Sequence, residues 1–214
     1  MTLPLPLRNR LAELIIDAFH DAAARDSLET LVAACADPGA LGESVPPRFP
    51  IELFEHRGDG WRIRAGYRAH AADLAERAGR AARALAGRPL ATGDPPLAEI
   101  LDEAASLFEA GLYFEVHELL EPSWIRADGA TRQGLQGLIQ VAVGFQHLAN
   151  GNVEGARALL HEGAAKLLGQ RLEGRDADGF ARSVAACERE VIRLGDRAAL
   201  TFDWTRVPRF PAAG

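Results

Sequence analysis

Apolar residues recur at helical spacing through most of the chain, and this pattern predicts an all-α protein. In the first part of the chain, the periodic segments predict helices over 7–24, 27–35 and 67–86. Ser27 precedes the second of these segments, and serine is a good N-cap residue type, so we expect it to start that helix.

Two stretches interrupt this helical pattern. Residues 37–50 hold four Pro and two Gly, which predicts a loop. Residues 51–64 alternate apolar and polar positions around Gly58-Asp59-Gly60, which favours one short β-hairpin. Residues 1–90 are therefore expected to form a mainly helical N-terminal extension or small domain.

Residues 91–96, with the sequence ATGDPP, mark the expected boundary to a second domain, 91–214. In this domain, helical spacing returns in five segments separated by helix-breaking residues: 95–110, 112–124, 131–149, 152–170 and 176–194. Short connections between them predict a compact helical bundle, in which the second and third helices form a central antiparallel hairpin. A Pro-rich tail ends the chain.

The first helix of this hairpin carries polar residues among aromatic ones. At 100° per residue, one side of it holds Leu120, Tyr113, Trp124, His117, Glu121, Phe114 and Glu118, in that order. His117 and Glu121 are one turn apart between aromatic residues, so we expect both to be buried. Glu118 lies at the edge of this face and Glu115 beyond it. Pro122 is expected to disrupt the helix, because it lacks an N–H.

The second helix of the hairpin is uncharged over most of its length and has one polar stripe, Gln136, Gln140 and His147. Buried amides and imidazoles need hydrogen-bond partners. Antiparallel packing would place Gln136 opposite Glu121 and Gln140 opposite His117, with His147 further from the turn. The sequence therefore predicts a buried His/Glu/Gln polar cluster, in which replacing Glu121 with Ala would lower stability.

Charge and composition limit the partners. Residues 1–90 hold 12 basic and 12 acidic residues, whereas 91–214 hold 12 basic and 18 acidic residues, which gives the net charge of −6. An acidic domain is not attracted to phosphate backbones, so no nucleic-acid partner is expected.

The chain shows no sign of export or of a membrane span. Its N-terminus lacks the basic stretch and apolar core of a signal peptide, and its longest uncharged run is too polar to cross a bilayer. Cys35 and Cys187 are isolated, which gives neither a disulfide framework nor a CxxC site. We therefore expect a cytoplasmic protein with reduced thiols and no membrane partner.

Two segments of the hairpin carry a family resemblance. The first, FEAGLYFEVHELLEPSW, runs from Phe108 to Trp124, and the second begins with QGLIQ at Gln136 and continues through His147 to Gly155-Ala156. In this order and spacing they resemble the signature of the domain of unknown function 309 family. The resemblance covers about 95–195 and leaves the first 90 residues unassigned. It implies a compact helical-bundle domain of prokaryotic type, bacterial or archaeal, and it implies no activity.

Two hypotheses give the polar cluster a role within the protein or in catalysis. In the first, His117, Glu121, Gln136 and Gln140 set the register of the packed helices. In the second, His117 and Glu121 bind a divalent metal ion in a metal-dependent hydrolase-type enzyme, with Glu121 or Glu118 as the catalytic general base. The sequence reads His-Glu-x-x-Glu, without the second His of zinc proteases, and the Glu-x-x-His pairs of di-iron bundles are absent.

A third hypothesis is a binding module. The face formed by Tyr113, Phe114 and Trp124 would then hold a small ligand or a protein partner. The wider binding cluster consists of Tyr113, Phe114, Glu115, His117, Glu118, Glu121, Trp124, Gln136, Gln140 and His147. The sequence leaves these three functions open, together with the identity of any metal cofactor.

Overall fold

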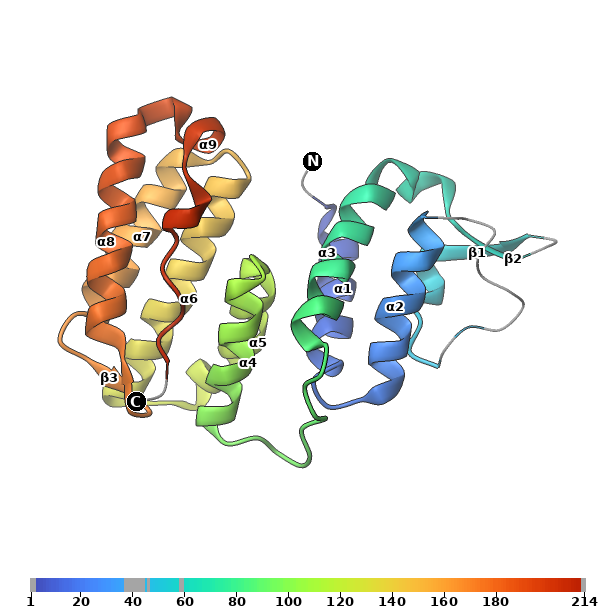
Figure 1. Cartoon of the computed structure of the whole chain (residues 1–214), viewed down its shortest axis with the longest axis horizontal. Coiled ribbons are helices and arrows are strands. Elements are labelled where there is room, and N and C mark those ends of the chain that lie inside the picture. The colour runs from blue at the N-terminus through green and yellow to red at the C-terminus, as the bar shows by residue number, and fades with distance from the viewer. Residues whose placement is uncertain (1–2, 37–44, 46, 58–59, 213–214) are drawn as a thin grey trace. The chain divides into compact units, whose positions relative to one another are not determined.

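The chain divides into two compact units, Met1–Asp94 and Pro95–Gly214. The computed structural model describes residues 3–36, 45, 47–57 and 60–212. Both units are mainly helical (Figure 1), and the strands among the described residues form two short antiparallel pairs. The predicted all-α class is therefore confirmed. Within these residues no helix is long and apolar enough to cross a membrane.

The described residues of the first unit form three α-helices, two short 3-10 helices and a hairpin. Its elements are α1 (Leu5–Asp17), α2 (Ala22–Ala36), η1 (Ile51–Leu53), β1 (Phe54–Arg57), β2 (Gly60–Ile63), η2 (Ala65–His70) and α3 (Ala71–Leu85). In the hairpin, Phe54 lies opposite Ile63, and both side chains are buried. The predicted hairpin within 51–64 is confirmed. Its turn at 58–59 and most of the loop predicted at 37–50 lie outside the described residues.

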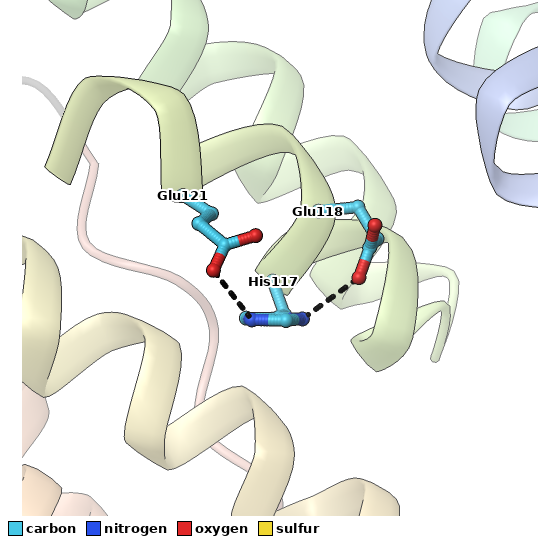
Figure 2. Close-up of side chains that lie close together, drawn as sticks. All are labelled: His117, Glu118 and Glu121. Atoms are coloured by element: carbon cyan, nitrogen blue, oxygen red, sulfur yellow. Dashed lines mark ion pairs between the residues drawn. The ribbon is translucent and has the colours of Figure 1, made fainter. Parts of the chain in front are cut away.

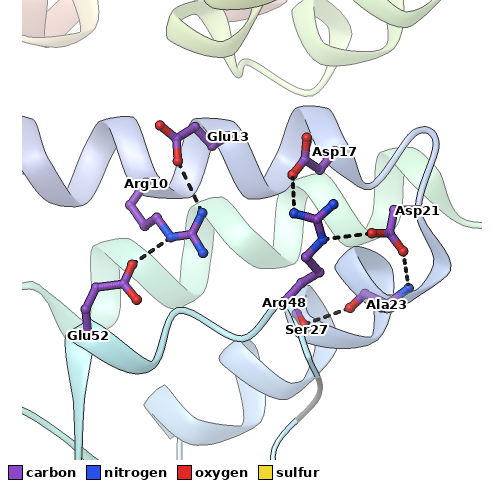
Figure 3. Close-up of polar contacts among 8 residues, drawn as sticks. All are labelled: Arg10, Glu13, Asp17, Asp21, Ala23, Ser27, Arg48 and Glu52. Carbon is purple, nitrogen blue, oxygen red and sulfur yellow. Dashed lines mark hydrogen bonds and ion pairs between the residues drawn. The ribbon is translucent and has the colours of Figure 1, made fainter.

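The start of α2 corrects the sequence prediction, which continued the first helix to residue 24. The helix α1 ends at Asp17, and α2 begins at Ala22 after Asp21 accepts a hydrogen bond from the Ala23 N–H at 2.8 Å. Ser27, the predicted N-cap, lies inside α2, where its buried hydroxyl donates to the Ala23 carbonyl at 2.7 Å (Figure 3). Asp and Ser are both good N-cap types, so residue type alone did not distinguish them.

Two arginines connect the segment after α2 with α1 and its end (Figure 3). Arg48 lies 3.6 Å from Asp17 and 2.9 Å from Asp21, and Arg10 lies 2.6 Å from Glu52. These side chains are between about a third and a half exposed, so each ion pair contributes about 0–1 kcal/mol. The apolar core, rather than these pairs, stabilises this unit.

The second unit is a bundle of consecutive helices that pack each against the next. Its elements are α4 (Leu97–Glu109), α5 (Tyr113–Arg126), α6 (Gly129–Ala149), α7 (Val153–Leu167), β3 (Arg171–Leu172), β4 (Arg175–Asp176), α8 (Ala177–Leu194), η3 (Gly195–Arg197), α9 (Ala198–Thr201) and η4 (Trp204–Arg206). The five long helices match the five predicted segments. Each pair of neighbours is joined by a short connection, which is why the order in space follows the order in sequence.

Close approach of α6 and α7 depends on glycine. A Cβ atom built on Gly163 would lie 2.8 Å from the Gly137 carbonyl oxygen and 2.9 Å from the Val141 backbone nitrogen. A Cβ on Gly144 would lie 2.9 Å from the Leu160 Cγ atom. These distances are shorter than real Cβ contacts, so the two backbones reach their packing distance because side chains are missing there.

The C-terminal segment lies against the bundle core. Phe210 is 4% exposed and its ring centroid lies 5.6 Å from that of Phe108. The Arg175 side chain, 3% exposed, donates to the Pro211 carbonyl at 3.1 Å, to the Ala98 carbonyl at 3.0 Å and to Asp102 Oδ1 at 2.8 Å. One guanidinium therefore holds together the start of α4, β4 and the end of the chain.

Asp178, in the first turn of α8, is expected to make the stability of this unit depend on pH. The backbone N–H of Gly169 and the Arg182 side chain donate to its carboxylate and hold the pKa of Asp178 below its ordinary value of 3.8. A carboxyl with a lowered pKa stabilises the fold above its unfolded-state pKa, and that contribution is lost as the pH falls through the folded pKa. Asp178→Asn should therefore unfold at lower urea concentration than wild type near neutral pH.

Below the folded pKa of Asp178 the two proteins should unfold at the same urea concentration, because the Asn amide resembles the protonated carboxyl. Urea unfolding at both pH values checks this result. A difference that stays constant from neutral to acidic pH would contradict it.

Candidate metal centre

The helix α5 brings His117, Glu118 and Glu121 to one side of the bundle. It begins at Tyr113 and continues through Pro122 to Arg126, so the expected disruption at Pro122 does not occur. The proline costs one backbone hydrogen bond, to the carbonyl of Glu118, but this is tolerated close to the end of the helix. Residues 117 and 121 therefore keep the one-turn spacing that the sequence predicted.

The imidazole of His117 lies between two carboxylates (Figure 2). Its Nδ1 atom lies 3.0 Å from Glu118 Oε1, and its Nε2 atom lies 3.9 Å from Glu121 Oε1. When each of the three residues offers one ligand atom, these atoms lie within 4.8 Å of one another. The arrangement is therefore a His–carboxylate cluster made by three residues within a five-residue stretch of one helix.

The cluster is partly exposed, which corrects the prediction that His117 and Glu121 are largely buried. The exposed fraction is 28% for the His117 side chain, 33% for Glu118 and 43% for Glu121. The loss of stability expected for Glu121→Ala depended on burial, and a side chain this exposed gives no reason to expect it.

The buried face of α5 explains this error. It consists of Tyr113, Glu115, Val116, Leu119 and Leu120. On the helical wheel this face is centred on the aliphatic residues, and His117 and Glu121 lie beside it. The sequence prediction gave weight to Phe114 and Trp124, but both of these aromatic side chains are partly exposed.

Two carboxylates that the sequence did not place in the core are buried there. Glu115 on α5 is 0% exposed and Glu103 on α4 is 1% exposed. Glu115 belonged to the wider predicted cluster, but the wheel placed it beyond the expected buried face. The aliphatic periodicity of α5, followed strictly, would have placed Glu115 on the core side.

The side-chain hydrogen bonds of the polar stripe of α6 go to α7 and its N-cap residue. The Gln140 amide nitrogen donates to Glu162 Oε2 at 2.7 Å, which corrects the expectation that this amide binds His117 or Glu121. Gln136 is partly exposed. The reason is that Gly137 and Gly144 let α7 approach α6 closely, so a side chain at position 140 reaches Glu162.

His147 belongs to the turn between α6 and α7. Asn152 Oδ1 accepts a hydrogen bond from the Gly155 N–H at 2.9 Å, so the Asn152 amide nitrogen is a donor. That nitrogen lies 2.9 Å from His147 Nδ1, which must therefore accept. In the neutral ring the proton is then on Nε2, which leaves no free lone pair for a metal. His147 orients Asn152, the N-cap residue of α7, and lies outside the His117 cluster.

The proposed aromatic binding face is divided by the fold. Tyr113 is 7% exposed and packs against Phe145, at 5.6 Å between ring centroids. Trp124 lies at the other end of α5, where the Arg132 guanidinium is 4.5 Å from the centre of its ring. Arg132 also donates to the Trp124 carbonyl at 2.9 Å. Both aromatic residues are thus occupied by contacts within the bundle.

Fold and site together define this unit as a small α-helical bundle with a partly exposed His–Glu–Glu cluster on its second helix. A family model described as "Domain of unknown function (DUF309)" matches residues 101–159, from α4 into α7. This match confirms the resemblance that the hairpin motifs indicated, over the segment that contains the cluster. A search of curated proteins and a search of solved structures each gave no significant match.

Proposed function

We propose that the second unit binds a divalent metal ion through His117, Glu118 and Glu121. The observation that carries this proposal is the spacing of the three ligand atoms, within 4.8 Å of one another. Ligand atoms about 2.0–2.2 Å from a metal are separated by about 3–4 Å. Small rotations of these partly exposed side chains would give that separation, without movement of the helix.

The chemistry of the donors supports a first-row divalent metal. An imidazole with two carboxylates suits ions such as Mn²⁺, Fe²⁺ or Zn²⁺, because it combines a nitrogen ligand with hard oxygen ligands. Two carboxylate charges would neutralise the charge of the ion. The exposed side leaves coordination positions for water, as in catalytic rather than structural zinc sites. A water molecule activated in this way is what a metal-dependent hydrolase requires.

His117→Ala is expected to abolish metal binding. Protein purified without chelator or affinity metal should carry near-stoichiometric metal, and the His117→Ala protein should carry none, because a nitrogen ligand and the centre of the cluster are lost. Elemental analysis and calorimetric titration with Zn²⁺ and Mn²⁺ measure this result.

The matched control is His161→Ala. His161 also pairs with a carboxylate, with its Nδ1 atom 3.1 Å from Glu188 Oε1, but it does not belong to the three-residue cluster. This variant should bind metal as wild type does. Equal metal content in wild type and His117→Ala, or no metal in wild type, would refute the proposal.

The other two hypotheses have less support in this geometry. Register setting fits the hydrogen bonds of Gln140 and His147, which join α6 to α7 and its cap, rather than the His117 cluster. Ligand or partner binding by the Tyr113 face would require a buried side chain to become accessible. A cytoplasmic location and a prokaryotic source stay predictions.

A further inference from the structure

The amide group of Gln140 is held in one orientation, and its oxygen has no hydrogen-bond donor among the described residues. Its nitrogen donates to Glu162 Oε2 at 2.7 Å, and because a carboxylate only accepts, the amide cannot be turned around. Its oxygen, Oε1, is buried and accepts no hydrogen bond from any residue that the structure describes. Buried acceptors usually have a hydrogen-bond or ligand partner, so this oxygen is available to an external donor or cation.

Gln140 lies at the level of His117 along the hairpin. The two helices α5 and α6 pack together and are joined by a short turn, so they run antiparallel. His117 stands nine residues before the last residue of α5, and Gln140 stands eleven residues after the first residue of α6. At about 1.5 Å per residue, their levels along the hairpin differ by roughly 3 Å.

We propose that Gln140 Oε1 is a further ligand of the metal ion at His117, so that the site joins α5 to α6. This inference rests on the proposed metal site. An amide oxygen is a neutral, hard ligand, and with one imidazole and two carboxylates it gives one nitrogen and three oxygen donors. This set suits Mn²⁺, Fe²⁺ and Zn²⁺.

In this arrangement Glu162 of α7 is a positioning residue. Its carboxylate accepts from the Gln140 amide nitrogen, fixes which end of the amide is the oxygen and increases the negative charge on that oxygen. Ligands of metal sites are commonly oriented by such outer carboxylates, and losing them weakens metal binding about 10–100-fold. Three consecutive helices of the bundle would then contribute to one metal site.

Calorimetric titration of the full chain with Mn²⁺ and Zn²⁺ tests this proposal. Gln140→Leu keeps the size of the side chain and removes the oxygen, so affinity should fall about tenfold or more. Gln146→Leu is the matched control, because Gln146 is a partly exposed glutamine on another side of the same helix. The Gln146→Leu protein should bind metal with the affinity of wild type. The visible absorption of bound Co²⁺ should change in Gln140→Leu and not in Gln146→Leu.

A third variant separates ligation from packing. Gln140→Glu keeps an oxygen ligand but places it beside Glu162, so without metal the Tm should fall, and added Mn²⁺ should restore it. A variant that disturbs packing alone would not be rescued by metal.

The outcomes are distinguishable. If wild type binds no metal, the proposed function itself fails. If wild type and Gln140→Leu bind metal with equal affinity and equal Co²⁺ absorption, the metal site exists but Gln140 is not a ligand, and Oε1 is satisfied by water.

Discussion

Gly163→Ala is expected to lower the free energy of unfolding of the second unit by about 1–3 kcal/mol, the range of an overpacked core. The added methyl group would lie 2.8 Å from the Gly137 carbonyl oxygen and 2.9 Å from the Val141 nitrogen. Both are backbone atoms, which cannot rotate aside as a long side chain can. The helices α6 and α7 would have to separate, and the contacts between them would weaken along their length. Urea unfolding followed by circular dichroism measures the change.

The control is Gly134→Ala, on the partner helix α6. A Cβ at this position would lie 3.4 Å from Gln170 Oε1 and 3.4 Å from a Leu172 methyl carbon, which are ordinary contacts. Alanine favours a helix over glycine by about 1 kcal/mol, so this variant should be as stable as wild type or more so. If Gly163→Ala were as stable to urea as Gly134→Ala, the result would contradict the close approach of α6 and α7.

Arg175→Leu is expected to cost about 2–4 kcal/mol, because a buried acceptor that loses its donor costs about 1–3 kcal/mol. The substitution leaves the carbonyls of Pro211 and Ala98 without the donor that they share. Asp102 loses less, because its side chain is 56% exposed and water can replace the guanidinium. Thermal and urea unfolding measure the loss.

Two comparisons show that geometry, rather than charge alone, causes this loss. Arg175→Lys keeps the charge, but one ammonium cannot reach three acceptors as the planar guanidinium does, so it should recover only part of the stability. Arg171→Ala, an exposed arginine in the same hairpin, should change stability by less than about 0.5 kcal/mol. Equal losses of stability in Arg171→Ala and Arg175→Leu would contradict the role given to the three hydrogen bonds of Arg175.

Much of the fold could be predicted because each helix of the second unit has its own start and stop signals. Gly111, Gly129 and Gly151 have positive φ angles where helices meet turns, and Asn152 caps α7 as expected. In the first unit the signals were ambiguous: Asp21 and Ser27 both suit an N-cap, and the apolar pattern ran across the break between α1 and α2. Local pattern fixes a helix more reliably than it fixes the residue at which the helix ends.

The candidate site could be predicted in part. The spacing of His117 and Glu121 places them together on any helix, so their proximity follows from sequence. Their exposure does not, because it depends on which side of α5 meets α4 and α6, and the aromatic residues pointed to the wrong side. The pairing of Gln140 with Glu162 joins residues 22 positions apart and depends on the close packing that glycine permits between α6 and α7.

The position of Arg175 also bears on what an independently folding fragment of this protein must contain. The family match ends at residue 159, inside α7, before β4 and α8. Yet Phe108, within the matched segment, has its ring 5.8 Å from Phe180 and 5.6 Å from Phe210, both beyond it. A fragment cut to the matched residues would remove two of the rings that cover Phe108, and it would lack both the first turn of α4 and the guanidinium that binds Asp102. The segment that matches the family is therefore shorter than the segment expected to fold by itself. We expect a fragment that carries the His117 cluster to need residues 95–212.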